Sequence, residues 1–70
     1  MGQVRAEMAG KVIQVCVSVG DAVSEDQDLI IIESMKMQIP VGAPEEGTVA
    51  KVYVVADQFL NEGDPIVDLG

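Results

Sequence analysis

The chain has 70 residues, of which 49% are hydrophobic, and twelve acidic against four basic residues give a formal net charge of −8. This length allows one small domain, and the negative charge argues against binding to nucleic acid phosphates or anionic membrane surfaces. The chain has no histidine and one cysteine, Cys16, which excludes an internal disulfide and the usual zinc sites. The sequence contains no apolar run long enough to span a membrane and no signal-peptide pattern, so we expect a soluble, cytoplasmic protein.

Short apolar segments, cut by turn residues, predict strands and no helix. In chain order, the predicted strands are residues 3–7, 11–18, 28–33, 37–41, 48–55 and 65–69, with short extended pieces around Val23 and Leu60. Cys16 is predicted to be a small residue within the second strand, and without a histidine base it is a poor nucleophile. Because only two residues are aromatic, we expect valine, isoleucine, leucine and methionine to fill the core.

The two halves of the chain repeat each other, with residues 1–33 matching residues 38–70. The repeat includes seven identities: Val4/Val41, Ala6/Ala43, Gly10/Gly47, Val12/Val49, Val15/Val52, Val17/Val54 and Glu25/Glu62. The turn residues also repeat, with Gly20-Asp21 and Asp26-Gln27 matching Asp57-Gln58 and Gly63-Asp64. We therefore predict a fold with pseudo-two-fold symmetry, whose termini lie together at the end opposite the middle of the chain.

The alternation of apolar and polar residues is interrupted within the second predicted strand of each copy. Val12 predicts a buried position 14, yet Gln14 is polar and Val15 and Val17 have the character of buried residues. The second copy repeats the interruption at Lys51. A β-bulge in each copy reconciles these patterns and helps a small sheet to close on itself.

The residues between the two copies are predicted to form a tight hairpin with Met35-Lys36 at its tip. The strands before and after leave room for few connecting residues, although a longer turn remains open at this stage. A two-residue hairpin prefers Asn-Gly or Asp-Gly, so Met-Lys is a poor turn sequence. A local rule broken at one exposed place indicates a functional site.

The sequence Met35-Lys36-Met37 between two β copies, with Met8-Ala9-Gly10 upstream and the Gly-Asp turns, resembles the biotinyl-lipoyl attachment domain. The resemblance covers essentially the whole chain and extends to small stand-alone biotin attachment proteins and the biotin carboxyl carrier domains of carboxylases. It implies a single domain, residues 1–70, with an all-β fold. That fold is a flattened eight-stranded barrel of two four-stranded sheets with internal pseudo-two-fold symmetry, also called a barrel-sandwich hybrid. The chain departs from the family at Glu7, where many members have proline, and at Asp57-Gln58, where Gly-Asp is usual.

The resemblance also implies a role for each residue of the tip. Lys36 is the lysine that a biotin protein ligase acylates, through a biotinyl adenylate, to form an amide. The attached biotin then carries CO2 as carboxybiotin between a biotin carboxylase and a carboxyltransferase, so the chain is a monomeric carrier and not an enzyme. Met35 and Met37 flank the lysine for recognition, with one of them packing into the barrel as an alternative. Glu33 and Ser34 are candidates for contact with partner enzymes.

Two alternative functions are left open by the sequence. A lipoyl carrier, or an acceptor of both cofactors, would serve acyl or aminomethyl transfer, although lipoyl members typically carry Asp-Lys-Ala where this chain has Met35-Lys36-Met37. An unmodified β-barrel interaction module would make the tip an ordinary loop. The chain is expected to be either a stand-alone carrier or a domain of a multidomain carboxylase, and a mitochondrial or plastid location stays open in the second case.

Overall fold

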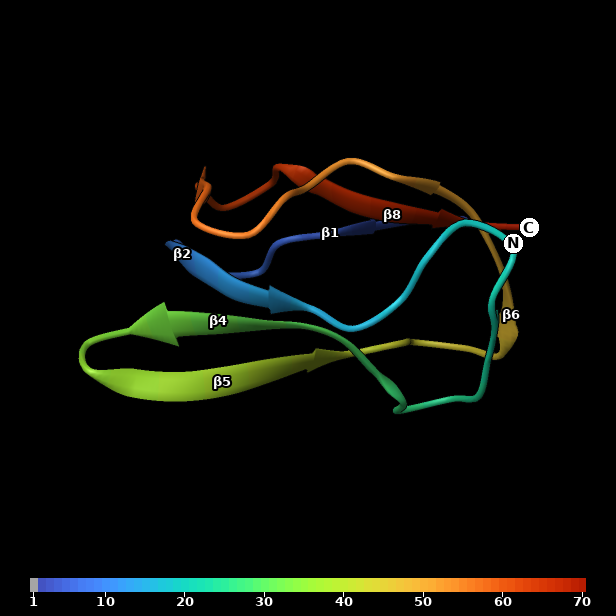
Figure 1. Ribbon diagram of the computed structural model, residues 1–70, viewed down its shortest axis with the longest axis horizontal. Coiled ribbons are helices and arrows are strands. Elements are labelled where there is room, and N and C mark those ends of the chain that lie inside the picture. Colours follow the sequence, from blue (N-terminus) through green and yellow to red (C-terminus); the bar gives the residue numbers. More distant parts are fainter. Residues whose placement is uncertain (1) are drawn as a thin grey trace.

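The computed structural model describes residues 2–70, and within this range the chain is all-β, without a helix (Figure 1). The fold therefore agrees with the alternation and turn residues of the sequence. The described residues contain no helix long and apolar enough to cross a membrane. The strands are β1 (Gly2–Arg5), β2 (Gly10–Val15), β3 (Ala22–Val23), β4 (Asp28–Ser34), β5 (Met37–Gly42), β6 (Gly47–Val52), β7 (Phe59–Leu60) and β8 (Pro65–Leu69).

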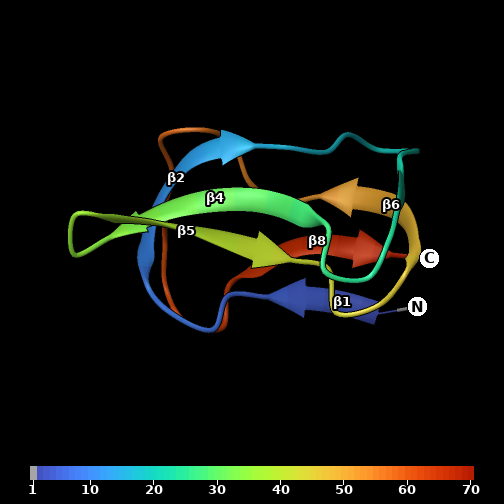
Figure 2. The same ribbon diagram turned by 90° about the horizontal axis from the view of Figure 1, so that it is seen from below.

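The strands form two four-stranded antiparallel sheets, in the orders β1-β8-β6-β3 and β5-β4-β2-β7. The hairpin of β4 and β5 extends beyond the rest of the molecule at one end, and both chain ends lie at the other (Figures 1 and 2). The pairing of Gly2 with Leu69 brings the two ends of the described chain together. The predicted flattened barrel, with its termini opposite the tip, is confirmed.

The core lies between the two sheets and consists of aliphatic side chains. Residues such as Leu29, Leu60 and Ile66 are fully buried, and burying each contributes about 1.5–3 kcal/mol relative to exposure. The expectation that methionine would help to fill the core is wrong for the described residues. Met8, Met35 and Met37 are all exposed to solvent. The buried valine, isoleucine, leucine and alanine side chains already fill this small interior.

The internal repeat is visible in the backbone hydrogen bonds outside the sheets. Corresponding amides of the two copies donate to corresponding carbonyl groups, across the two copies in most of these pairs and within one copy in the pair of Cys16 and Tyr53. The matched pairs include Ala6 N to Asp64 O with Ala43 N to Gln27 O, Cys16 N to Leu29 O with Tyr53 N to Ile66 O, and Gly20 N to Val49 O with Asp57 N to Val12 O. Each copy therefore supplies acceptors to the other, as pseudo-two-fold symmetry requires.

The predicted bulges are present in both copies. The register shifts between Val12 and Gln14 in β2, and between Val49 and Lys51 in β6. Both strands end earlier than expected, at Val15 and Val52. Cys16 is consequently an exposed residue just beyond β2, although its N–H still donates to Leu29 O.

Side chains of the following turns explain the early strand ends. The Asp21 carboxylate accepts a hydrogen bond of 2.8 Å from Ser18 N, and the Gln58 side-chain oxygen accepts one of 3.1 Å from Val55 N at the equivalent position. These side chains satisfy backbone donors that would otherwise have needed a neighbouring strand. The first strand also ends early, at Arg5 instead of residue 7, after a register shift between Val4 and Arg5.

Candidate functional site

The β4–β5 hairpin ends in a two-residue turn. Ser34 pairs with Met37, which leaves Met35 and Lys36 as the central residues of the turn, with φ angles of 54° and 65°. Both residues are in the left-handed region, as a type I′ turn requires. That region costs a residue with a side chain about 1–2 kcal/mol, and neither position is glycine, asparagine or aspartate. The longer turn is thus excluded, and the strained tip inferred from the sequence is present.

Side chains at the tip point into solvent. Met35 is 91% exposed and Met37 is 60% exposed, so the alternative that one methionine packs into the barrel is wrong. Lys36 is also exposed. The hairpin therefore presents an amine between two accessible apolar side chains, at the far end of the molecule from both termini (Figure 2).

Lys36 differs from the other two lysines in its surroundings. Lys11 Nζ lies 3.8 Å from the Asp57 carboxylate, and Lys51 Nζ lies 4.7 Å from the centre of the Tyr53 ring. Lys36 has no hydrogen bond, ion pair or ring contact with any residue between 2 and 70. The exposed Lys11 pair contributes little to stability, but it does place a carboxylate beside the amine. Of the three amines, that of Lys36 is the one without a partner among residues 2–70.

Glu33 and Ser34 lie at the end of β4, directly before the turn. Glu33 is exposed and pairs with Lys11 on β2 and with Gln38 on β5. Ser34 is half-buried on the opposite face of the hairpin. All five residues predicted for the site are therefore on one hairpin, with Lys36 at its apex.

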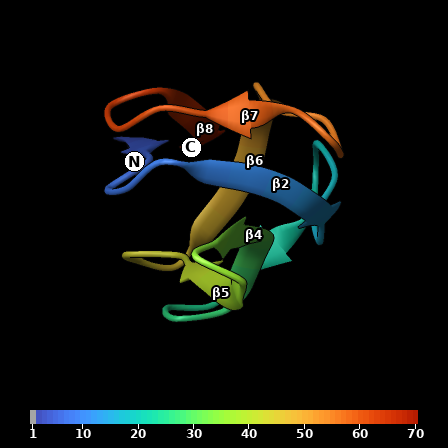
Figure 3. The same cartoon turned by 90° about the vertical axis from the view of Figure 1, so that its left-hand side faces the viewer.

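The sequence analysis missed Phe59, which lies on the same sheet as this hairpin. Phe59 on β7 pairs with Lys11, which continues the row of Glu33 and Gln38 across the sheet. We call Phe59, Lys11, Glu33 and Gln38 the apex row. Figure 3 shows β7, β2 and the hairpin together on the end of the molecule that carries the tip. Alternation about the buried Leu60 would have indicated that Phe59 faces outward.

A hydrogen-bonded cluster occupies the outer face of the other sheet. Tyr53 Oη donates to the Asp68 carboxylate at 2.6 Å, and Gln3 Nε2 donates to the same side chain at 3.2 Å. The hydrogen bond to Asp68, followed by desolvation, raises the pKa of Tyr53 above its usual value of 10.0. None of these three residues belongs to the predicted site, and the Asp68 carboxylate accepts hydrogen bonds from both neutral neighbours.

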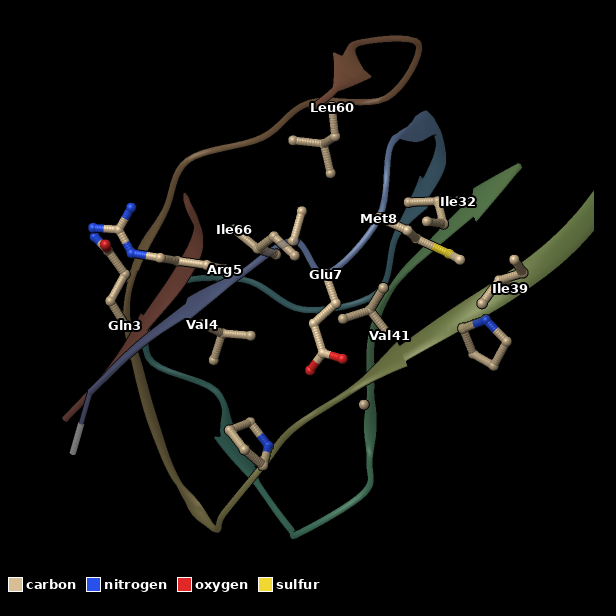
Figure 4. A pocket seen from close by; sticks show the side chains of 14 residues that line it. Gln3, Val4, Arg5, Glu7, Met8, Ile32, Ile39, Val41, Leu60 and Ile66 are labelled. Carbon is tan, nitrogen blue, oxygen red and sulfur yellow. The ribbon is translucent and has the colours of Figure 1, made fainter. Parts of the chain in front are cut away.

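A pocket of about 530 Å³ lies between the β1 segment and β5 (Figure 4). Its apolar lining includes Ile39, Val41 and Leu60, with Arg5 and Glu7 among the polar residues. Lys36 is not among the described residues that line it. Within residues 2–70, no three histidine, cysteine, aspartate or glutamate side chains are grouped to hold a metal ion. Neither the pocket nor a metal-binding cluster is therefore found at the tip of the hairpin among the described residues.

Comparisons with known proteins agree with this reading of the fold. Residues 2–69 match the family described as biotin-requiring enzyme. The chain is 41% identical over 66 residues to the biotin/lipoyl attachment protein of Bacillus subtilis, covering 94% of this chain and 90% of that protein. It is 46% identical over 66 residues to mitochondrial pyruvate carboxylase of Mus musculus, covering 94% of this chain but only 6% of that enzyme.

A solved structure shows the same likeness in three dimensions. The urea carboxylase of Kluyveromyces lactis matches with a TM-score of 0.90 and 29% identity, over 97% of this chain and 6% of that enzyme. The long carboxylases thus contain a segment of this fold, whereas the Bacillus protein is nearly the same length as the chain. The family match over almost all residues, together with the fold, shows that the chain belongs to the biotin/lipoyl attachment family.

Proposed function

We propose that the chain is a biotin carboxyl carrier in which Lys36 holds biotin through an amide bond. The observation that carries the proposal is the position of Lys36, at the exposed apex of a strained two-residue turn in a fold of the biotin/lipoyl attachment family. Neither Lys11 nor Lys51 combines an apex position with an unoccupied amine. The 70 residues act as one attachment domain and have no catalytic role of their own.

The residues of the tip fit a covalently attached biotin. The unprotonated ε-amine of Lys36 attacks the activated carboxyl group of biotin, a C–N bond forms, the activating group leaves and the amine loses a proton. Met35 and Met37, being exposed, leave the amine open to an enzyme from both sides. When bound, biotin supplies a ureido nitrogen that accepts and releases a carboxyl group.

The domain contributes position to this chemistry. The β4–β5 pairing from Ser34–Met37 to Ile30–Val41 holds the apex away from the core, so that an enzyme can enclose the tip without meeting the barrel. Tethering raises the local concentration of the attached group at every site the tip can reach. The carrier needs no groove for this task, because the enzymes provide the reaction sites.

The partners we propose are a biotin protein ligase, a biotin carboxylase and a carboxyltransferase. Relatives named pyruvate carboxylase and propionyl-CoA carboxylase support partners of the carboxylase class. We propose that the isolated domain is monomeric and works in the cytoplasm. The identity of the carboxyl acceptor depends on the carboxyltransferase.

A lipoyl carrier is the second candidate function. The name of the Bacillus subtilis relative, biotin/lipoyl attachment protein, covers both cofactors, and the fold serves either. Methionine on both sides of Lys36 favours biotin, because lipoyl members of the family typically have Asp-Lys-Ala at the position of Met35-Lys36-Met37. The same lysine would then carry lipoate for acyl or aminomethyl transfer.

Intact-mass analysis after treatment with biotin, ATP and a biotin protein ligase tests the proposal. We expect the mass of one biotinyl group, with the modified peptide containing Lys36, and no labelling of Lys36→Arg. A parallel reaction with lipoate and a lipoate ligase measures the second candidate. Labelling that persists in Lys36→Arg, or lipoylation in place of biotinylation, would contradict a biotin carrier.

A further inference from the structure

The apex row puts an exposed aromatic ring beside the tip. Phe59 is 61% exposed and lies in line with Lys11, Glu33 and Gln38 on the outer face of the hairpin sheet. The Glu33–Gln38 pair directly follows the Ser34–Met37 pair that closes the turn. The row therefore crosses the sheet immediately below Lys36.

The internal repeat shows that the fold does not require an aromatic residue here. The residue equivalent to Phe59 in the first copy is Ala22, which also directly precedes a buried residue, Val23, in a two-residue strand. Leu60 and Val23 are both buried, so each short strand is anchored by its inner residue. Phe59 thus adds a large apolar surface that the barrel does not use.

Charged residues follow Phe59 along the apex row. Lys11 lies on the adjacent strand and is paired with Asp57, and Glu33 is the next residue across the sheet. An apolar group within a polar rim is the usual composition of a protein–protein contact, and aromatic residues are common among those that dominate binding. The area is small, so it fits the edge of a larger contact centred on the tip.

Two kinds of enzyme meet the tip, and they differ in how closely they must approach. An acylating enzyme must bring Lys36 Nζ itself into its active site, and only the four methylene groups of the side chain separate that atom from the backbone. Once acylated, the arm is longer by the whole attached group, so its reactive end lies farther from the barrel. The acylating enzyme therefore has to cover the residues beside the apex.

We propose that Phe59, with Lys11 at its side, is an anchor for the enzyme that acylates Lys36, and that its ring enters an apolar pocket of that enzyme. This inference rests on the proposed attachment at Lys36. The occupant is a biotin protein ligase in its complex with the unmodified domain. The apex row lies directly below the turn that carries Lys36, on the same sheet. An enzyme that encloses Lys36 would therefore also cover Phe59.

Steady-state kinetics of biotinylation, with the whole domain as the varied substrate, test the proposal. We expect Phe59→Ala to raise KM for the domain about tenfold with little change in kcat, because docking contacts are made equally in the ground and transition states. Phe59→Met should retain most of the affinity. Val19→Ala is the matched control, since Val19 is 65% exposed and next to Gly20, which bonds to Val49 near the termini.

Thermal unfolding of each variant separates docking from folding, and an unchanged melting temperature is expected for Phe59→Ala. The proposed anchor role would be overturned by an unchanged KM for Phe59→Ala, by a fall in its kcat alone, or by an equal rise in KM for Val19→Ala. So would a defect found only when biotinylated Phe59→Ala is used as a carboxylase substrate. Failure of the wild-type domain to become biotinylated would instead refute the proposed function itself.

Discussion

At the residue scale, a glycine in a turn of one copy corresponds to an aspartate in the same turn of the other copy. Gly20 and Gly63 have φ angles of 95° and 91°, and their counterparts Asp57 and Asp26 have 74° and 68°. All four residues are therefore in the left-handed region, which glycine occupies without the cost that other residues bear. The same backbone shape is imposed at both places by the symmetric hydrogen bonds, so each copy contains one avoidable strain.

Replacing Asp26 with glycine should stabilise the protein. We expect Asp26→Gly to increase the free energy of unfolding in urea by about 0.5–1 kcal/mol, because relief of the left-handed strain exceeds the extra entropy of the unfolded glycine. Asp28→Gly, at an exposed position of β4 with negative φ, should lower it. Equal losses in the two variants would show that the strain at Asp26 is negligible.

Tyr53 provides a prediction about pH. Its pKa is raised chiefly by its hydrogen bond to the Asp68 carboxylate, so tyrosinate absorbance should titrate above pH 10.0, and Asp68→Asn should lower that pKa. The signal is unambiguous because the chain has one tyrosine. Since the folded pKa exceeds the unfolded one, the stabilisation is complete below about pH 10 and is lost as pH rises through the folded value. The stability difference between wild type and Tyr53→Phe should shrink in that range. A pKa of Tyr53 unaffected by Asp68→Asn would contradict this account.

At the element scale, β5 is both the arm of the functional hairpin and the edge of its sheet. A two-residue turn makes Ser34 and Met37 a hydrogen-bonded pair, so alternation places Pro40, opposite Ile31, in a non-hydrogen-bonded pair. The nitrogen of Pro40 therefore faces the open edge and offers no donor. Proline at such a position discourages pairing with another strand, which suits a carrier whose exposed hairpin must stay available.

The geometry of the hairpin turn should control modification. Inserting one glycine between Met35 and Lys36 is expected to preserve the fold, because the turn lies outside the core, but to reduce biotinylation severely by displacing the amine from the apex. Circular dichroism checks the fold, and intact mass after ligase treatment measures the labelling. A glycine inserted between Glu45 and Glu46, in the turn before β6, is the matched control and should leave labelling unchanged. Normal labelling of the first insertion would show that the ligase tolerates the displacement.

At the scale of the whole molecule, the sequence predicted the fold well because the repeat doubles each signal. The apolar alternation is interrupted after Val12 and after Val49, and this repeated interruption predicted the paired bulges. The early ends of β2 and β6 were not predictable, because they depend on the Asp21 and Gln58 side chains bonding to the backbone. The hairpin followed from its position between the two copies, whereas the roles of its five residues came from the family resemblance and stay predictions. The place of Phe59 beside Lys11 was not predicted, because it depends on the pairing of β7 with β2, which lies far away in the sequence.

Attachment at the apex should change the charge of the molecule without changing its stability. Acylating Lys36 removes one positive charge and takes the formal net charge from −8 to −9, so the modified domain should migrate faster toward the anode in a native gel at neutral pH. Lys36 contacts none of residues 2–70 through a hydrogen bond or ion pair, so the free energy of unfolding should change by less than about 0.5 kcal/mol.

Comparing melting curves of the two forms, each confirmed by intact mass, measures this second effect, and Lys36→Gln reproduces the charge change without the attached group. The three species should unfold at nearly the same temperature, because the core lies between the sheets and the apex lies beyond it. A large shift confined to the biotinylated form would mean that the attached group folds back onto the barrel, for which the pocket between the β1 segment and β5 is a candidate. The proposed exchange of cargo with two enzymes works best without such a contact, since any affinity of the arm for its own domain would compete with both reaction sites.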